Sequence, residues 1–127
     1  ICDEVANGKI NDPFMAQDPL LEESPFAKNS INDFTQNIQG VMVLYNGNYL
    51  QNHLGLEELV RFYSLSLDQE IKTQHAEAMA ALQQIPAPFG ESIINHPILI
   101  QHAMDKINAL ESTLQGKLKP FIRQYVR

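Results

Sequence analysis

The chain has 127 residues, of which 44% are hydrophobic and 19% charged, and its formal net charge is −6. These values suit one globular domain that buries roughly two-thirds of its unfolded surface. The negative balance argues against a nucleic-acid partner, which needs a basic face, and no apolar run approaches the ~18–20 residues of a membrane helix. The single cysteine, Cys2, excludes an internal disulfide. The alternatives are a lipid-attachment remnant, a free thiol and a buried helix residue, and the last is favoured because free cysteine usually behaves as a small buried hydrophobe.

The first ten residues, ICDEVANGKI, are typical of the last turns of a helix that ends near Asn7 and Gly8. Glycine readily adopts the left-handed conformation that closes helices. Residues 9–29 contain three prolines and predict a long irregular connection, a kind of segment that is usually functional or mobile. The abrupt start, without an initiator methionine or a signal peptide, suggests a chain cut from a longer protein.

A helix is predicted to begin at Ser30 and to end at the stop signal of residues 46–48. Ser30 and Asp33 have the spacing of a capping box, in which the hydroxyl and the carboxylate each accept an unpaired backbone N–H. Apolar residues at spacings of three and four predict a buried stripe: Ile31, Phe34, Ile38, Val41 and Tyr45.

A second long helix is predicted from Gly55 to Gln84, followed by a short helical turn over residues 89–95. Asp68 and Lys72 have i,i+4 spacing and are expected on its exposed side. The residues expected on its buried face are Leu56, Leu59, Val60, Tyr63, Leu67, Ile71, Ala78 and Leu82.

The last helix is predicted to open at Pro97, because proline is favoured in the first turn, and its apolar stripe runs to Tyr125. Pro120 clashes with the carbonyl of Gly116, so a bend is expected there. No β-type alternation occurs in the sequence. The pattern therefore predicts one all-α domain over residues 1–127, an up-and-down helical bundle of the four-helix type whose first helix is truncated.

The sequence contains no motif that would indicate a catalytic residue or a metal ligand in this chain. His53 with Glu57, and His102 with Asp105, have the spacing of two ligands on one helix face, but neither pair has an evident third partner. They are better explained as surface polar residues. No Gly-x-Ser-x-Gly elbow and no glycine-rich phosphate loop is present.

The segment from Asp3 to Phe89 resembles the second half of the imelysin-like proteins, a family also called iron-regulated protein A or insulin-cleaving metallopeptidases. The matching stretches are DEVANGKINDPF, EESPFAKNSINDFTQNIQGV, LYNGNY, SLD and AALQQIPAPF. The resemblance implies a longer protein with two helical-bundle halves and a site in the cleft between them. It also implies export to the bacterial periplasm or surface, often with a lipid anchor, and a link to iron uptake.

The diagnostic family motif, Gly-x-His-x-x-Glu, is absent from this chain. When the motif helix of the family is aligned with QGVMVLYNG, Gln39 occupies the position of the histidine, Met42 that of the glutamate and Asn37 that of the glycine. Glutamine and methionine are poor ligands for a hard cation such as Fe³⁺. The resemblance thus implies that no cofactor is held by this chain alone, whereas iron or another metal is expected in the full-length protein.

The resemblance makes six polar residues candidates for lining the cleft toward the missing half; the alternative is that they tie the loop to the helix end. They are Glu23, Ser24, Asn29, Ser30, Asp33 and Asn37. The leading interpretation is an extracytoplasmic binding module in iron uptake, without enzymatic activity of its own. A metallopeptidase half-domain and a structural or interaction bundle remain as alternatives. The expected partners are the missing N-terminal half or a second copy, and a membrane only through a lipid anchor outside this chain.

Overall fold

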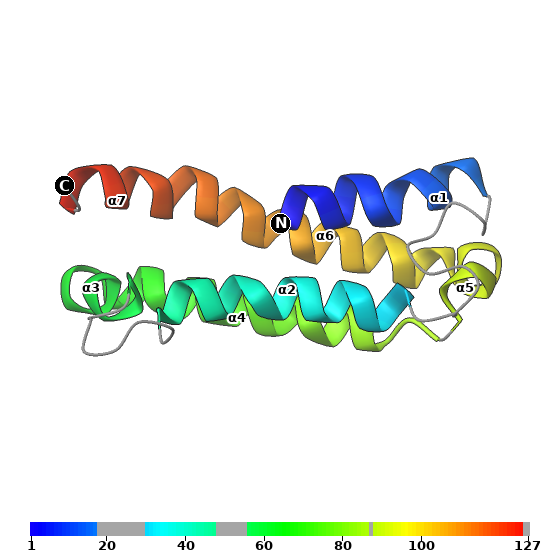
Figure 1. Cartoon of the computed structure of the whole chain (residues 1–127), viewed down its shortest axis with the longest axis horizontal. Helices are drawn as coiled ribbons and strands as arrows, with labels where there is room; N and C mark the ends of the chain where they lie inside the picture. Colours follow the sequence, from blue (N-terminus) through cyan, green and yellow to red (C-terminus); the bar gives the residue numbers. More distant parts are fainter. Residues whose placement is uncertain (18–29, 48–55, 87, 126–127) are drawn as a thin grey trace.

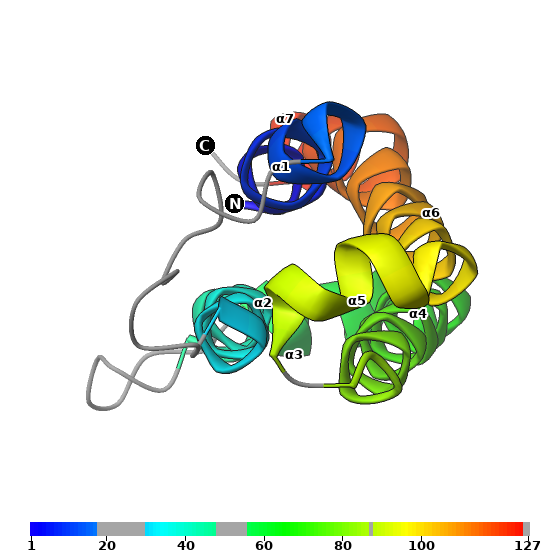
Figure 2. The same ribbon diagram turned by 90° about the vertical axis from the view of Figure 1, so that its right-hand side faces the viewer.

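The computed structural model describes residues 1–17, 30–47, 56–86 and 88–125. Within these ranges the regular structure is helical and includes no strand. Long helical rods lie side by side, and one short helix crosses an end of the bundle (Figures 1 and 2). The prediction of an all-α bundle is therefore confirmed. No helix in the described ranges is long and apolar enough to cross a membrane.

The first rod continues past the point where the sequence predicts its end. After Cys2 and Asp3 it runs as a π-helix, η1 (Glu4–Ile10), and then as α1 (Asn11–Ala16). The predicted end at Gly8 and the predicted irregular start at residue 9 are wrong. Burial of Ile10 and Pro13 outweighs the local glycine and proline signals, because tertiary packing overrides propensity. The helix closes instead at Gln17, whose backbone is left-handed with φ 54°.

Helix α2 (Ser30–Asn46) has the predicted bounds. Gly47 ends it with a φ of 67°, and its N–H donates to the carbonyl of Val43 at 3.2 Å. A left-handed residue at this position is usually glycine, which has no side chain to strain. Except for the half-buried Ile31, the predicted stripe is buried: Phe34, Ile38, Val41 and Tyr45.

The second predicted helix is two helices, α3 (Leu56–Tyr63) and α4 (Leu65–Gln83). The chain breaks at Ser64, with φ −154° and ψ 86°, and the Ser64 hydroxyl accepts the N–H of Leu67 at 3.4 Å. A serine N-cap of this kind satisfies a donor that the new helix would leave unpaired. Tyr63, predicted to be buried, is 51% exposed at the break.

The last rod comprises α6 (Pro97–Thr113), a π-helical turn η3 (Leu114–Leu118) and α7 (Lys119–Tyr125), preceded by the crossing helix α5 (Phe89–Asn95). The predicted start at Pro97 and the short helix are confirmed. The π-helical turn lies where Pro120 was predicted to disturb the helix. A wider turn accommodates a proline that has no N–H and clashes with the carbonyl of Gly116.

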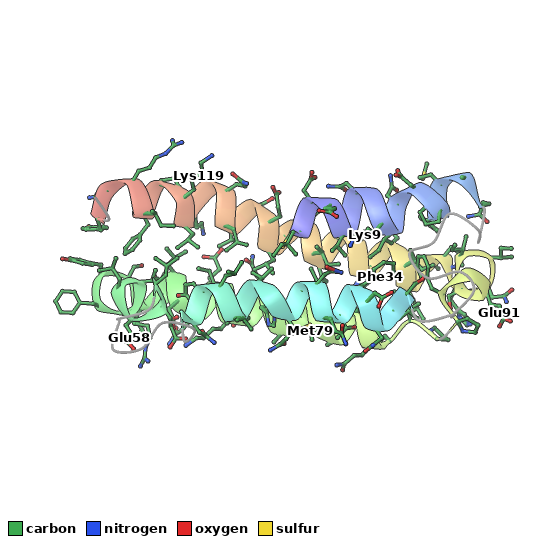
Figure 3. All side chains as sticks on the ribbon, viewed as in Figure 1. Lys9, Phe34, Glu58, Met79, Glu91 and Lys119 are labelled. Carbon is green, nitrogen blue, oxygen red and sulfur yellow. The ribbon has the colours of Figure 1, made fainter. Side chains whose placement is uncertain are left out.

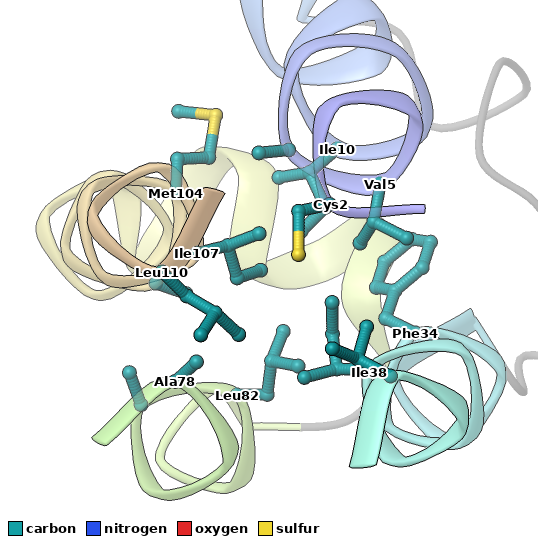
Figure 4. Packing of buried hydrophobic residues seen from close by; sticks show 14 of the residues in the cluster. Cys2, Val5, Ile10, Phe34, Ile38, Ala78, Leu82, Met104, Ile107 and Leu110 are labelled. Carbon is teal, nitrogen blue, oxygen red and sulfur yellow. The ribbon is translucent and has the colours of Figure 1, made fainter. Parts of the chain in front are cut away.

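One cluster of buried side chains joins the rods. Figure 4 shows Cys2 and Val5 from the first rod facing Ile38 of α2, Leu82 of α4 and Leu110 of α6. Cys2 is buried, as expected. In Figure 3 Phe34 lies between α2 and the first rod, whereas Lys119 and Glu58 point outward. The ring of Phe34 meets that of Phe89 edge to face at 5.1 Å, which ties α5 to the bundle.

Candidate functional site

The predicted site residues on α2 lie along one flank of the helix. Ser30, Asp33 and Asn37 follow at spacings of three and four and therefore share a face beside the apolar stripe. Ser30 is fully buried, while Asp33 and Asn37 are half-buried. The Asn37 amide donates to the backbone carbonyl of Asp33 at 2.7 Å. The capping role of Ser30 and Asp33 stays a prediction.

The other three predicted site residues cannot be placed. Glu23, Ser24 and Asn29 lie outside the described residues, as does His53 of one histidine pair. The structure thus brings together half of the predicted set, at the start of α2, and leaves the role of the whole set a prediction.

The α2 positions that align with the family's metal motif do not fit a metal ion. Met42 is packed into the core, and Gln39 is exposed. A thioether in an apolar core and a neutral amide in solvent are not the oxygen ligands that a hard cation requires. No three His, Cys, Asp or Glu side chains of the described ranges converge as metal ligands do.

A cavity of about 360 Å³ lies at the other end of α2. It is open to solvent and is bounded by the start of the first rod, the end of α2, the start of α3, and the junction of α6 with η3. Its walls are mainly apolar, and two carboxylates, Asp3 and Glu111, contribute to its lining. The apolar lining comes from Ile1, Cys2, Val41, Leu44, Leu56, Leu114 and Leu118. Of the predicted site residues that the structure describes, Ser30, Asp33 and Asn37, none lines this cavity.

Tyr45 is also among the residues that line the cavity, and its hydroxyl joins a network of charged side chains in which Asp68 is buried and the others are partly exposed. The hydroxyl donates to the Asp68 carboxylate at 2.7 Å, and both residues are 3% exposed. Lys72 lies 3.2 Å from Asp68 and 3.5 Å from Glu57, which in turn lies 3.6 Å from Arg61. Burial, followed by the hydrogen bond to Asp68, raises the pKa of Tyr45, so the hydroxyl stays protonated and remains a donor.

The sequence analysis missed this network. It placed Asp68 on the exposed side of its helix, which is wrong, because Asp68 faces α2 and is buried. One signal was available: a tyrosine on an apolar stripe usually needs a polar partner for its hydroxyl. The identity of that partner depends on how α2 packs against α4, and the spacing within either helix does not reveal it.

His75 is a second buried polar group on the α2–α4 interface. Its Nε2 lies 3.1 Å from the carbonyl of Ile38, and because a carbonyl only accepts, Nε2 carries the proton. Burial lowers the pKa of His75, although the bond to Ile38 opposes the shift. His75 therefore fixes the register of the two helices as a neutral imidazole. His102 and Asp105, the other predicted pair, are exposed, and Asp105 accepts a hydrogen bond from Gln101 at 2.9 Å.

Known proteins that are similar to this chain in sequence or in fold are longer than the chain itself. The sequence profile of the family described as Imelysin matches residues 1–114. The chain is 26% identical over 124 residues to the iron-regulated protein A of Synechococcus elongatus, covering 94% of this chain and 35% of that protein.

Two solved structures have the same fold over nearly the whole chain, each with a TM-score of 0.79. One is an imelysin peptidase from Bacteroides ovatus, 30% identical, of which 36% is covered while 95% of this chain is matched. The other is a putative iron-regulated protein A precursor from Parabacteroides distasonis, 24% identical, with 90% of this chain and 36% of that one covered. The chain thus spans about a third of the length of these relatives.

Proposed function

The chain belongs to the imelysin family, and from this premise we propose that it is one part of an extracytoplasmic module that binds iron or a ligand carrying iron. In this proposal the polar flank at the start of α2 forms one wall of the ligand cleft, and the rest of a longer protein forms the other wall.

The observation that supports this role is the shared face of Ser30, Asp33 and Asn37. Asp33 and Asn37 are half-buried, so they are held by the bundle and still reach the surface. The Asn37 amide nitrogen donates to the backbone carbonyl of Asp33, and the side-chain oxygen of Asn37 is the atom that can accept a hydrogen bond from a ligand. A carboxylate and a side-chain amide can hydrogen-bond a hydrated or chelated metal complex without being ligands of the metal itself.

The names of two relatives support the link to iron, because both are described as iron-regulated protein A. The word precursor in the name of the Parabacteroides distasonis protein supports export. We propose that the complete protein is located in the bacterial periplasm or on the cell surface, with any lipid anchor outside residues 1–127.

The metal itself is assigned to the longer protein, because Gln39 and Met42 do not fit it here. The residues of this chain then orient the bound species through the flank of α2. Isothermal titration with Fe²⁺, with Fe³⁺ supplied as its citrate complex, and with Zn²⁺ tests this division. The longer polypeptide is expected to bind an iron species, and the chain of residues 1–127 is not. A stoichiometric micromolar site on residues 1–127 alone would contradict the proposal.

The name of the Bacteroides ovatus relative supports a second candidate, metal-dependent peptide hydrolysis by the longer protein. Such chemistry needs three metal ligands and a general base around an activated water. Peptide hydrolysis by the longer polypeptide that requires the histidine of its Gly-x-His-x-x-Glu motif would select this candidate. Binding of iron without hydrolysis would select the first.

A further inference from the structure

The end of the bundle formed by α3 and α7 carries the most exposed aromatic side chain of the described residues. Phe62, on the last turn of α3, is 80% exposed. Leu65, the first residue of α4, is 54% exposed and lies close to Phe62, because both line an open hollow of about 320 Å³ together with Glu58 and Arg61. Figure 1 shows α3 and α7 at the same end of the bundle, and in Figure 3 Glu58 points outward there.

These four residues form one patch with a defined pattern. Glu58, Arg61 and Phe62 have the i, i+3 and i+4 spacing of one helix face, and Leu65 joins them across the break at Ser64. The opposite side of α3 contributes Val60 to the core. Single exposed apolar residues are ordinary on a protein surface, whereas apolar residues that gather within a charged rim mark an interaction site.

The ring of Phe62 is supported from behind by other aromatic rings. Tyr63 meets it edge to face at 4.9 Å, and Tyr63 itself stacks on Tyr125 at 4.1 Å. An aromatic side chain that is already held in place loses little conformational freedom on binding, which is a property of residues that dominate interfaces.

We propose that the patch of Glu58, Arg61, Phe62 and Leu65 binds the same patch on a second copy of this chain across a two-fold axis. A two-fold interface must be self-complementary, and this patch is, because it holds one acid and one base beside two apolar side chains. When two α3 helices pair in opposite directions, Phe62 of each copy enters the hollow of the other. Glu58 of each copy then faces Arg61 of the other.

Arg61 can make this contact without losing the one it has. Its guanidinium lies 3.6 Å from Glu57 of its own chain, but the side chain is 54% exposed, and a guanidinium has five N–H donors. It can therefore bind a second carboxylate.

The charges favour a second copy over other partners. A nucleic acid or an anionic lipid surface is recognised by a basic face, whereas this patch carries equal numbers of acids and bases. Because the patch is locally neutral, two copies can meet there although each chain has a formal net charge of −6. So small a contact gives a weak dimer, and the contact requires no iron, so it goes beyond the proposed function.

Exchanging the two charges tests the pairing. The longer polypeptide that contains residues 1–127 is studied by sedimentation velocity up to about 1 mM, where a small interface associates. Glu58→Arg and Arg61→Glu should each associate at least tenfold more weakly than the unchanged protein, because each brings like charges together at both contacts. An equimolar mixture of the two variants should recover the association, because the mixed pair again brings opposite charges together.

The apolar part of the patch has a matched control. Phe62→Ala should also weaken association at least tenfold, whereas Ile98→Ala should not, although Ile98 is 82% exposed near the start of α6, at the opposite end of the bundle. A monomer at the highest concentration would overturn the proposal, as would a dimer that Phe62→Ala leaves intact. A mixture of the charge variants that associates no better than either variant alone would overturn it too. Sedimentation is measured without iron, so failure here is distinguishable from failure of the proposed function.

Discussion

The hydrogen bond from Tyr45 to Asp68 should contribute measurably to stability, and Tyr45→Phe removes it without creating a cavity. Both residues are 3% exposed, and their oxygens are 2.7 Å apart, so water cannot readily replace the lost donor. A hydrogen bond to a charged group contributes about 1.5–3 kcal/mol. Lys72, at 3.2 Å from Asp68, still compensates part of the charge, so we expect a loss of about 2 kcal/mol.

In a domain of this size, 1 kcal/mol corresponds to a change of about 4 °C in melting temperature, so Tyr45→Phe should lower it by about 8 °C. Urea unfolding followed by far-UV circular dichroism measures the free energy directly. Tyr125→Phe is the control, because Tyr125 is 40% exposed and its ring contacts survive the change; it should stay within about 0.5 kcal/mol. A loss below about 0.5 kcal/mol for Tyr45→Phe would refute the reasoning.

Two further predictions concern α4. Burial lowers the pKa of His75 in the folded chain, so its contribution to stability is complete above the ordinary pKa of 6.5 and is lost as the pH falls below that value. His75→Gln should therefore flatten the dependence of the melting temperature on pH between pH 7 and 5. His102→Gln, at an exposed position, is the control and should leave this dependence as it is. An unchanged slope in His75→Gln would count against a neutral His75 in the folded chain. Ser64→Ala removes the N-cap of α4 and should lower the free energy of unfolding, measured in urea, by about 1 kcal/mol. Ser66→Ala, within the exposed first turn, should lower it clearly less. Equal losses for the two variants would refute the capping role.

Local sequence signals predicted a helix boundary correctly where the residue at that boundary itself determines the backbone conformation. The start of α6 follows from Pro97, and the end of α2 from Gly47, because each residue restricts or permits the backbone at its own position. The same reasoning failed at Gly8 and Pro13, which the core holds inside a continuous rod. The cost of a glycine or proline in a helix is offset there by buried apolar contacts from distant parts of the chain.

The candidate site was predictable only where one helix determines it. The resemblance made Ser30, Asp33 and Asn37 candidates, and their spacings of three and four put them on one face of α2 in the structure. Asp68 was misplaced because its partner, Tyr45, lies 23 residues away on another helix. The cavity is also beyond local prediction, since separate segments of the chain line it.

The most direct test of the proposed cleft is the affinity of Asp33→Asn for iron, measured in the full-length polypeptide by isothermal titration beside a thermal melt. Asp105→Asn, which removes the same charge from an exposed position on α6, is the matched control. If Asp33 lines the cleft, binding of the Fe³⁺ citrate complex should weaken more than tenfold while the melting temperature hardly moves, and Asp105→Asn should change neither. Unchanged affinity together with a lower melting temperature, equivalent to a loss of up to about 1 kcal/mol in the free energy of unfolding, would make Asp33 a helix cap and contradict the account.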